Sequence, residues 1–137
     1  MKPEDLNELD LLTACIMGEA EGESLLGKLG VACVIRNRTQ DNRWPDDYRR
    51  VILQPYQFSC MLEEYLRPEI LVHHWPSVAW RECRLAAVSV LPEEGYNVGD
   101  VTESSNHYYA TALIEKPSWA KGHQMQIGIG GHAFFKL

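Results

Sequence analysis

Apolar residues recur every three or four positions in the first part of the chain, and this spacing predicts helices. The first run begins near Pro3, carries acidic residues in its first turn and should end near Glu19. Gly22 interrupts the pattern, and Glu23-Ser24 then opens a second helix that closes around Asn37. The sequence therefore predicts two consecutive helices joined by a short acidic junction.

Two further helices are indicated downstream. A short one is predicted over residues 46–52, because Asp46 after Pro45 can cap its start and Gln54-Pro55 stops it. Another should begin at Ser77, a candidate N-cap, and end before Pro92. The segment 63–74 stays ambiguous, since a proline interrupts any long helix there.

The period of the pattern changes in the last third of the chain. Residues 107–110 and 124–129 look like strands, and Gly130-Gly131 followed by 132–135 looks like a hairpin turn with its return strand. Helices first and a small antiparallel sheet last predict an α+β fold with a cleft between the two parts. At 137 residues with 45% hydrophobic residues, we expect one domain spanning residues 1–137.

Charge narrows the possible partners. The formal net charge of −6 argues against nucleic acid, because phosphate-binding surfaces cluster Lys and Arg. The two short basic runs, Arg36-Asn37-Arg38 and Arg49-Arg50, are predicted to be solvated helix ends. We expect a monomer, although the sequence leaves the oligomeric state open.

The start of the chain is acidic and amphipathic, without the basic residues and apolar run of a secretory signal. No apolar run reaches membrane-spanning length either. We therefore expect a protein made in the cytoplasm without a signal peptide and without membrane insertion.

The cysteines indicate neither a metal site nor a nucleophile. Cys15, Cys33, Cys60 and Cys83 are widely separated, and we expect buried free thiols. Together with His73-His74 they match no compact zinc spacing, and their surroundings look neither electropositive nor exposed. No metal or other cofactor is expected.

The densest acidic cluster lies at the junction of the first two helices. A carboxylate at a helix C-terminus meets the negative end of the dipole and, if partly buried, holds its proton more tightly. Glu19 continues the apolar stripe of Leu12 and Ile16, so it should point along the edge of the core and could act as a general acid. Glu21 and Glu23 are expected to be solvated, with Glu23 favouring the start of the second helix.

Several segments of the chain match the motifs of one known family. Residues 19–23 and 29–38 are similar to a Glu-Ala-Arg-Gly-Glu and Val-Ala-x-Val-Ile-x-Asn-Arg signature, with Glu21 standing where the family usually has Arg. Further similar segments follow in the family's order: Gln57-Phe58-Ser59, Asp100-Val101-Thr102, His107-Tyr108-Tyr109, Pro117-Ser118-Trp119-Ala120 and residues 129–135. Together these segments resemble the SleB-type cell wall hydrolases.

The resemblance implies a lysozyme-like or transglycosylase-like fold that acts on bacterial peptidoglycan, with Glu19 as the catalytic residue. The implied substrate contacts are Gln57, Phe58, Ser59, His107, Tyr108, Tyr109, Trp119 and His132. Aromatics in strands are more often core, so a core role for Phe58, Phe134 and Phe135 stays open. Glu23 and Asp100 are possible auxiliary acids, although Asp100 reads equally well as a turn residue.

A single convincing carboxylate favours lytic transglycosylation between N-acetylmuramic acid and N-acetylglucosamine, which gives 1,6-anhydro ends. Hydrolysis by a muramidase is one alternative, although it generally needs a second carboxylate. A non-catalytic peptidoglycan-binding module is another. The expected setting is a phage-type endolysin that is released at lysis and acts on the cell wall.

Overall fold

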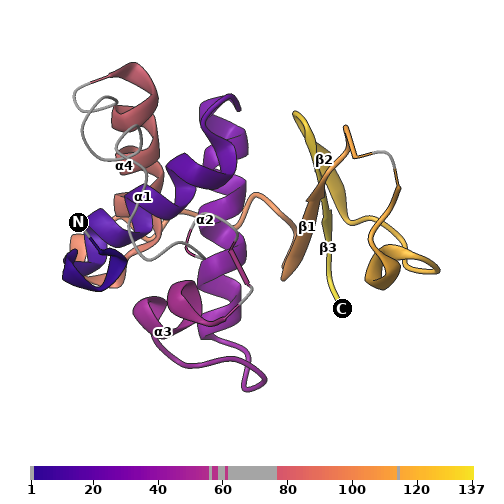
Figure 1. The fold of residues 1–137 in the computed structure, drawn as a ribbon, viewed down its shortest axis with the longest axis horizontal. Coiled ribbons are helices and arrows are strands. Elements are labelled where there is room, and N and C mark those ends of the chain that lie inside the picture. The colour runs from indigo at the N-terminus through magenta and orange to yellow at the C-terminus, as the bar shows by residue number, and fades with distance from the viewer. Residues whose placement is uncertain (1, 56, 59–60, 62–76, 114) are drawn as a thin grey trace.

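The computed structural model describes residues 2–55, 57–58, 61, 77–113 and 115–137. Within these ranges helices come first and strands last, which confirms the predicted α+β class (Figure 1). The elements are α1 (Glu8–Ala20), α2 (Leu25–Thr39), α3 (Tyr48–Leu53), α4 (Val78–Val90), β1 (His107–Ala110), β2 (Ile127–Ile129) and β3 (His132–Phe135). Short 3₁₀ turns occupy Pro3–Asp5, Pro92–Glu94 and Ser118–Ala120.

Each of these helices begins at a polar cap. The side chains of Asn7, Ser24, Asp47 and Ser77 accept hydrogen bonds from backbone N–H groups in the first turns of α1 to α4. The predicted cap Asp46 was wrong by one residue, since Asp47 caps α3. The prediction that the first helix starts near Pro3 was also wrong. Leu6 is extended with ψ 146°, so Pro3–Asp5 forms a separate turn and α1 starts after its cap.

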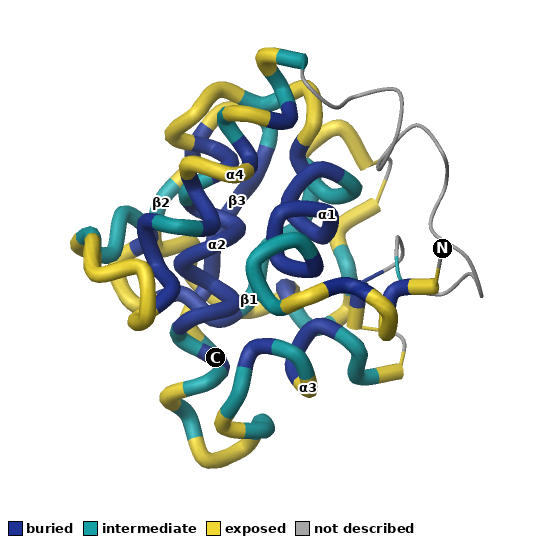
Figure 2. The backbone as a smooth tube through the Cα atoms, turned by 90° about the vertical axis from the view of Figure 1, so that its left-hand side faces the viewer, coloured by how far each residue is buried: buried dark blue, intermediate teal, exposed yellow. Residues whose placement is uncertain are grey.

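The main core lies where α1, α2, α3 and α4 pack together, and it appears as the dark blue inner sides of these helices in Figure 2. Cys15, Cys33 and Cys83 belong to this core as buried free thiols, as predicted, whereas Cys60 lies outside the described residues. Burial of these thiols raises the pKa of Cys83 to about 12, which makes it a poor nucleophile.

The basic run at the end of α2 is buried, which corrects the prediction of a solvated helix end. Arg36 and Arg38 are only 8% and 6% exposed. The segment between α4 and β1 crosses this end of the helix: Arg36 Nη1 donates to Val98 O at 2.6 Å, and Arg38 Nε donates to Asn106 O at 2.9 Å. Backbone carbonyls from distant parts of the chain therefore satisfy both guanidinium groups.

The sheet has the order β1-β3-β2, and both pairs are antiparallel. The predicted hairpin at Gly130-Gly131 joins β2 and β3, but β2 is shorter than the predicted strand 124–129. Because side chains alternate along a strand, the paired Tyr108 and Phe134 share one face and the paired Tyr109 and Ala133 share the other.

The first of these faces, the inner face, packs on α2, as Figure 1 shows from the side. Phe134 lies fully buried against Gly30 of α2, where an added Cβ would come within 2.8 Å of Phe134 Cζ. A glycine at this position therefore allows the sheet to approach the helix closely.

Candidate active site

Glu19 lies half-buried in the last turn of α1 and interacts electrostatically with Arg38, which lies at the seam between α2 and the sheet. The chain turns sharply after it, because Glu23 N donates to Ala20 O at 3.0 Å before Ser24 caps α2. Glu19 is thus held at the end of a rigid helix, next to the start of a second one.

Arg38 is the cation of this seam. Its Nη1 donates to Gln57 Oε1 at 3.1 Å, and its guanidinium carbon lies 5.3 Å and 5.5 Å from the ring centres of Trp44 and Phe58. These contacts fix a buried positive charge beneath the seam and bring the segment after α3 against α2.

The electrostatics link Arg38 to two predicted site residues. Burial lowers the pKa of Arg38, while the nearby Tyr108, Cys15 and Glu19 oppose that shift. Tyr108 from β1 and Glu19 from α1 are therefore both close enough to interact with the same guanidinium group. This arrangement agrees with a shared site at the seam.

The three predicted substrate contacts in the segment after α3 have different outcomes. Gln57 is exposed and accepts the Arg38 hydrogen bond. Phe58 is only 2% exposed, so the core interpretation is confirmed, and its ring supports Arg38 from below. Ser59 lies outside the described residues.

Tyr108 and His132 lie together on the inner face of the sheet, with ring centres 5.1 Å apart in an edge-on arrangement. His132 is buried, and its Nδ1 has no hydrogen-bond partner among the described residues. Burial lowers the pKa of His132, and the neighbouring Glu23 opposes the shift. His132 therefore stays neutral at neutral pH and packs beneath Tyr108.

Glu23 is not a solvated side chain, which corrects the prediction. Its side chain is 22% exposed, and its Oε1 accepts a hydrogen bond from Gly131 N at 2.7 Å. The turn of the β2–β3 hairpin covers it, a contact across more than a hundred residues that helical periodicity does not reveal.

His107, Tyr109 and Trp119 form a separate group on the other face of the sheet, the outer face. The Trp119 ring centre lies 4.9 Å from that of His107 and 6.0 Å from that of Tyr109. Tyr109 also stacks on Phe135 at 5.6 Å. The structure thus separates these three residues from Tyr108 and His132.

His107, the first residue of β1, is the third member of this outer group. Burial lowers its pKa to about 4, and the positive charges of Arg38 and Arg43 add to this shift. Its Nδ1 lies 2.8 Å from Asn106 Oδ1, and its ring packs edge-on against Trp44. His107 is therefore neutral and held by packing.

Asp100 organises a loop with both carboxylate oxygens. Oδ1 accepts from Thr102 N and Oγ1, and Oδ2 accepts from Asn37 Nδ2 and Ser104 N. Burial raises its pKa, but these hydrogen bonds outweigh burial and leave the pKa below its ordinary value. These contacts favour the turn-residue interpretation.

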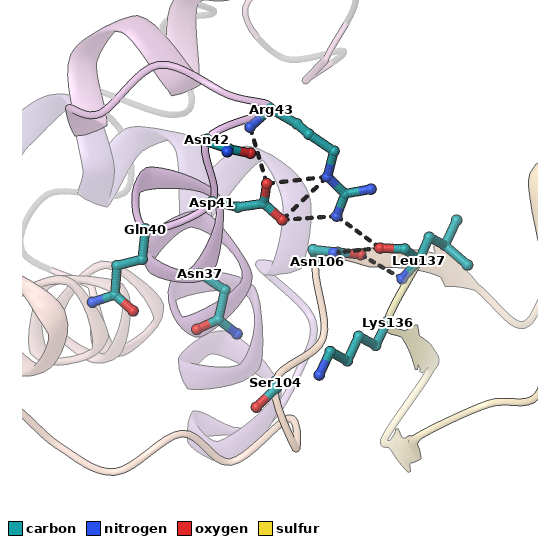
Figure 3. Close-up of a pocket in the computed structure, with 9 residues that line it drawn as sticks. All are labelled: Asn37, Gln40, Asp41, Asn42, Arg43, Ser104, Asn106, Lys136 and Leu137. Carbon is teal, nitrogen blue, oxygen red and sulfur yellow. Dashed lines mark hydrogen bonds and ion pairs between the residues drawn. The ribbon is translucent and has the colours of Figure 1, made fainter.

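The pocket in Figure 3 is polar and has a volume of about 520 Å³. Arg43 donates to Asp41 and to Leu137 O there. Asn106 Nδ2 donates to Leu137 O, and its Oδ1 accepts from Leu137 N (Figure 3). Two further pockets, of about 390 and 380 Å³, lie on the outer side of α4 and beside the Asp100 loop. Glu19 lines none of these three.

Two residues of the seam were missed by the sequence prediction. Arg38 ends the second motif of the resemblance, which could have marked it, but its charge suggested a solvated helix end. Trp44 follows α2 in a loop and carried no signal. In the described parts of the chain, no group of three His, Cys, Asp or Glu side chains could hold a metal ion. No helix of those parts is long and apolar enough to cross a membrane.

The fold and site together define an α+β protein with a half-buried carboxylate at its helix–sheet seam. A family model described as Cell Wall Hydrolase matches residues 22–135, so the chain belongs to the cell wall hydrolase family. Glu19 lies just before the matched range.

Curated relatives agree with this assignment. The chain is 27% identical over 128 residues to the spore cortex-lytic enzyme of Bacillus subtilis (strain 168), covering 93% of this chain and 37% of that enzyme. It is 34% identical over 65 residues to the spore cortex-lytic enzyme of Halalkalibacterium halodurans, covering 46% of this chain and 20% of that enzyme. The chain thus spans well under half the length of these relatives.

Two solved structures share the fold. The catalytic domain of the Bacillus cereus SleB protein superposes with a TM-score of 0.70 at 25% identity, covering 94% of this chain and 89% of that one. The catalytic domain of SleB from Bacillus anthracis superposes with a TM-score of 0.71 at 24% identity, covering 94% and 93%. Both span nearly all of this chain, and the first confirms the SleB-type resemblance.

Proposed function

We propose that this chain cleaves the glycan strands of bacterial peptidoglycan between N-acetylmuramic acid and N-acetylglucosamine, with Glu19 as catalytic acid and base. Membership of the cell wall hydrolase family supports the substrate class. The observation that carries the proposal is the position of Glu19, half-buried at the end of α1 and within electrostatic reach of Arg38.

The first chemical step is protonation of the bridging oxygen by Glu19. The bond from that oxygen to the muramic acid ring then breaks as an oxocarbenium-like state develops on the ring. Placement at the C-terminal end of α1 favours the protonated carboxyl group, because the helix dipole disfavours a negative charge there. The leaving sugar departs with the proton of Glu19.

In the second step the muramyl 6-hydroxyl attacks the same carbon and gives a 1,6-anhydro end. Glu19, now ionised, accepts the hydroxyl proton and regains its starting state. The buried charge of Arg38 stabilises the transient carboxylate, and Tyr108 offers a ring face and a hydroxyl group to the sugar.

Ring closure is favoured over hydrolysis because the two predicted auxiliary acids are engaged. Asp100 uses both oxygens to hold its own loop, and Glu23 accepts a hydrogen bond from the β2–β3 turn. Hydrolysis generally needs a second carboxylate that can activate water or attack the sugar. Backbone N–H groups hold both side chains in their own turns, which supports a mechanism without a second acid.

Product analysis tests the proposal. Purified protein should clear a peptidoglycan suspension, and mass spectrometry of the released fragments should find 1,6-anhydro muramic acid ends. Glu19→Gln should lower the clearing rate by ~10²–10⁴-fold. Glu21→Gln, an exposed neighbour, is the matched control and should stay near wild type.

The outcomes separate the alternatives. Reducing muramic acid ends alone would reject transglycosylation in favour of a muramidase. Binding without clearing by the wild-type protein would indicate a binding module. The phage-type endolysin setting, the single domain and the monomeric state stay predictions, which lysis of permeabilised host cells, limited proteolysis and light scattering can test.

A further inference from the structure

We propose that Glu23 is a positioning residue that fastens the β2–β3 hairpin to the junction of α1 and α2, and not a second catalytic carboxylate. The proposal rests on the function proposed above, because it concerns how the sugar-binding side of the seam is held opposite Glu19. It is carried by contacts that Glu23 makes with two distant parts of the chain.

The first contact orders the hairpin turn at Gly131, whose N–H and C=O groups are both hydrogen-bonded. Glu23 Oε1 accepts from Gly131 N at 2.7 Å, and Gly131 O accepts from Thr111 N at 2.8 Å. The Thr111 hydroxyl reaches the same carbonyl at 3.2 Å. Both polar groups of Gly131 are therefore used, and its N–H group is bound by a residue from the junction of α1 and α2.

Three glycines make room for the Glu23 side chain. A Cβ added at Gly130 would come within 2.5 Å of Glu23 Oε1, and one at Gly131 within 3.2 Å of Oε2. A Cβ at Gly27, on the first turn of α2, would come within 2.9 Å of Glu23 Cβ. Gly130 also has φ +55°, which glycine adopts without strain. The turn is shaped around this side chain.

The second contact ties Glu23 to the helix that carries the catalytic acid. Its backbone N donates to Ala20 O, directly after Glu19. On the hairpin side, the residue after Gly131 is His132, whose Nδ1 lies 3.9 Å from Glu23 Oε1 and whose ring supports Tyr108. One residue therefore sets the spacing between Glu19 and the inner face of the sheet.

This geometry is unsuited to a general base. A base must present a free lone pair to the water or hydroxyl group that it activates. Glu23 directs Oε1 at a backbone N–H group, and both oxygens face the glycine turn. A glutamine in its place retains a carbonyl oxygen that accepts the same hydrogen bond, whereas it cannot act as a base.

Two substitutions at this position distinguish the roles. Glu23→Gln should keep kcat for peptidoglycan clearing within about threefold of wild type, because the hydrogen bond survives. Glu23→Ala should lower kcat by ~10–100-fold, because a small misplacement of catalytic groups has that effect. A Glu23→Gln variant as inactive as Glu19→Gln would overturn the proposal, as would a fully active Glu23→Ala variant. If the alanine variant does not fold, the activity of Glu23→Gln still decides whether this carboxylate is catalytic.

A readout independent of catalysis keeps the two proposals distinguishable. Amide hydrogen exchange at Gly131 should be slow in wild type and Glu23→Gln and faster in Glu23→Ala. If wild type clears no peptidoglycan, the proposed function fails while this measurement still tests whether Glu23 fastens the hairpin. An unprotected Gly131 amide in wild type would overturn that positioning role.

Gly131→Ala and Glu23→Ala together form a double-mutant cycle that tests the contact between the two residues. Alone, Gly131→Ala should weaken the hairpin, since its Cβ meets the Glu23 carboxylate, and in the Glu23→Ala background its added effect on Tm should shrink. Strictly additive shifts in Tm would contradict the contact.

Discussion

The two faces of the small sheet are both rich in aromatic and histidine side chains, yet they differ in what surrounds them. On the inner face, Tyr108 and His132 lie close to charged groups, namely Arg38 of α2 and Glu23 of the junction between α1 and α2. On the outer face, Tyr109 and Trp119 pack with Phe135 into a small cluster of their own. Positive charge reaches the outer group too, because Arg38 and Arg43 both act on His107, so the inner face is distinguished by the approach of a cation, Arg38, together with a carboxylate, Glu23.

The largest expected difference between the two faces is in how much each contributes to the free energy of unfolding. Phe134→Ala should lower the free energy of unfolding by about 3–5 kcal/mol, because it empties the contact between the inner face and α2. Phe135→Ala removes the same side chain from the smaller outer cluster, where the loss should lie at the low end of this range, at about 3 kcal/mol. Urea denaturation of both variants measures the difference. Equal losses would show that the two faces contribute alike.

The close approach of the inner face to α2 gives the next largest effect. Gly30→Ala should destabilise the protein by about 1–3 kcal/mol, because the new Cβ meets the ring of the buried Phe134. Gly22→Ala is the control, since nothing lies within 4 Å of a Cβ there. Thermal unfolding should separate the two. A Tm for Gly30→Ala at or above the control would contradict the packing described.

Activity should follow the inner face. Tyr108→Phe should slow peptidoglycan clearing by about tenfold, because it removes the hydroxyl group that interacts electrostatically with Arg38. Tyr109→Phe makes the same change on the outer face and should stay within about twofold of wild type. Initial clearing rates at equal protein concentration provide the test. A larger loss for Tyr109→Phe would move the site to the outer face.

The smallest effect is a pH dependence from His107. Its pKa is about 4 in the folded protein against an ordinary value of 6.5, so between these values the unfolded chain takes up a proton that the folded protein refuses. Stability should therefore fall as the pH drops through this window. Because the side chain is half-buried, solvent screening limits the contribution to about 1 kcal/mol.

His107→Phe should flatten the dependence, which urea denaturation at pH 7 and pH 5 measures. Parallel losses for the variant and wild type between these pH values would assign the dependence to other groups.

Local patterns predicted most of the secondary structure because their causes are local. The caps Ser24 and Ser77 bond to N–H groups only three residues away, and the glycine pair 130–131 marks the hairpin by its own turn geometry. The start of α1 was the least accurate boundary. Two competing signals lie close together there, the proline at residue 3 and the cap at Asn7.

The candidate site was only partly predictable. The position of Glu19 at the end of a helix follows from periodicity, and the resemblance supplied its proposed role. The burial of Arg38 and the engagement of Glu23 depend on partners 68 and 108 residues away along the chain. No pattern within a helix encodes such partners.

The amino-acid sequence by itself determined the order of helices and strands, the apolar residues that form the core and the family, because each depends on residue types at short spacing. Only the tertiary structure decided which face of β1 meets the helices and which charges are buried. Those outcomes depend on how the 91–106 segment and the hairpin cross the ends of α1 and α2. Contacts between distant segments, formed once the chain is packed, choose among side chains that look equivalent in the sequence.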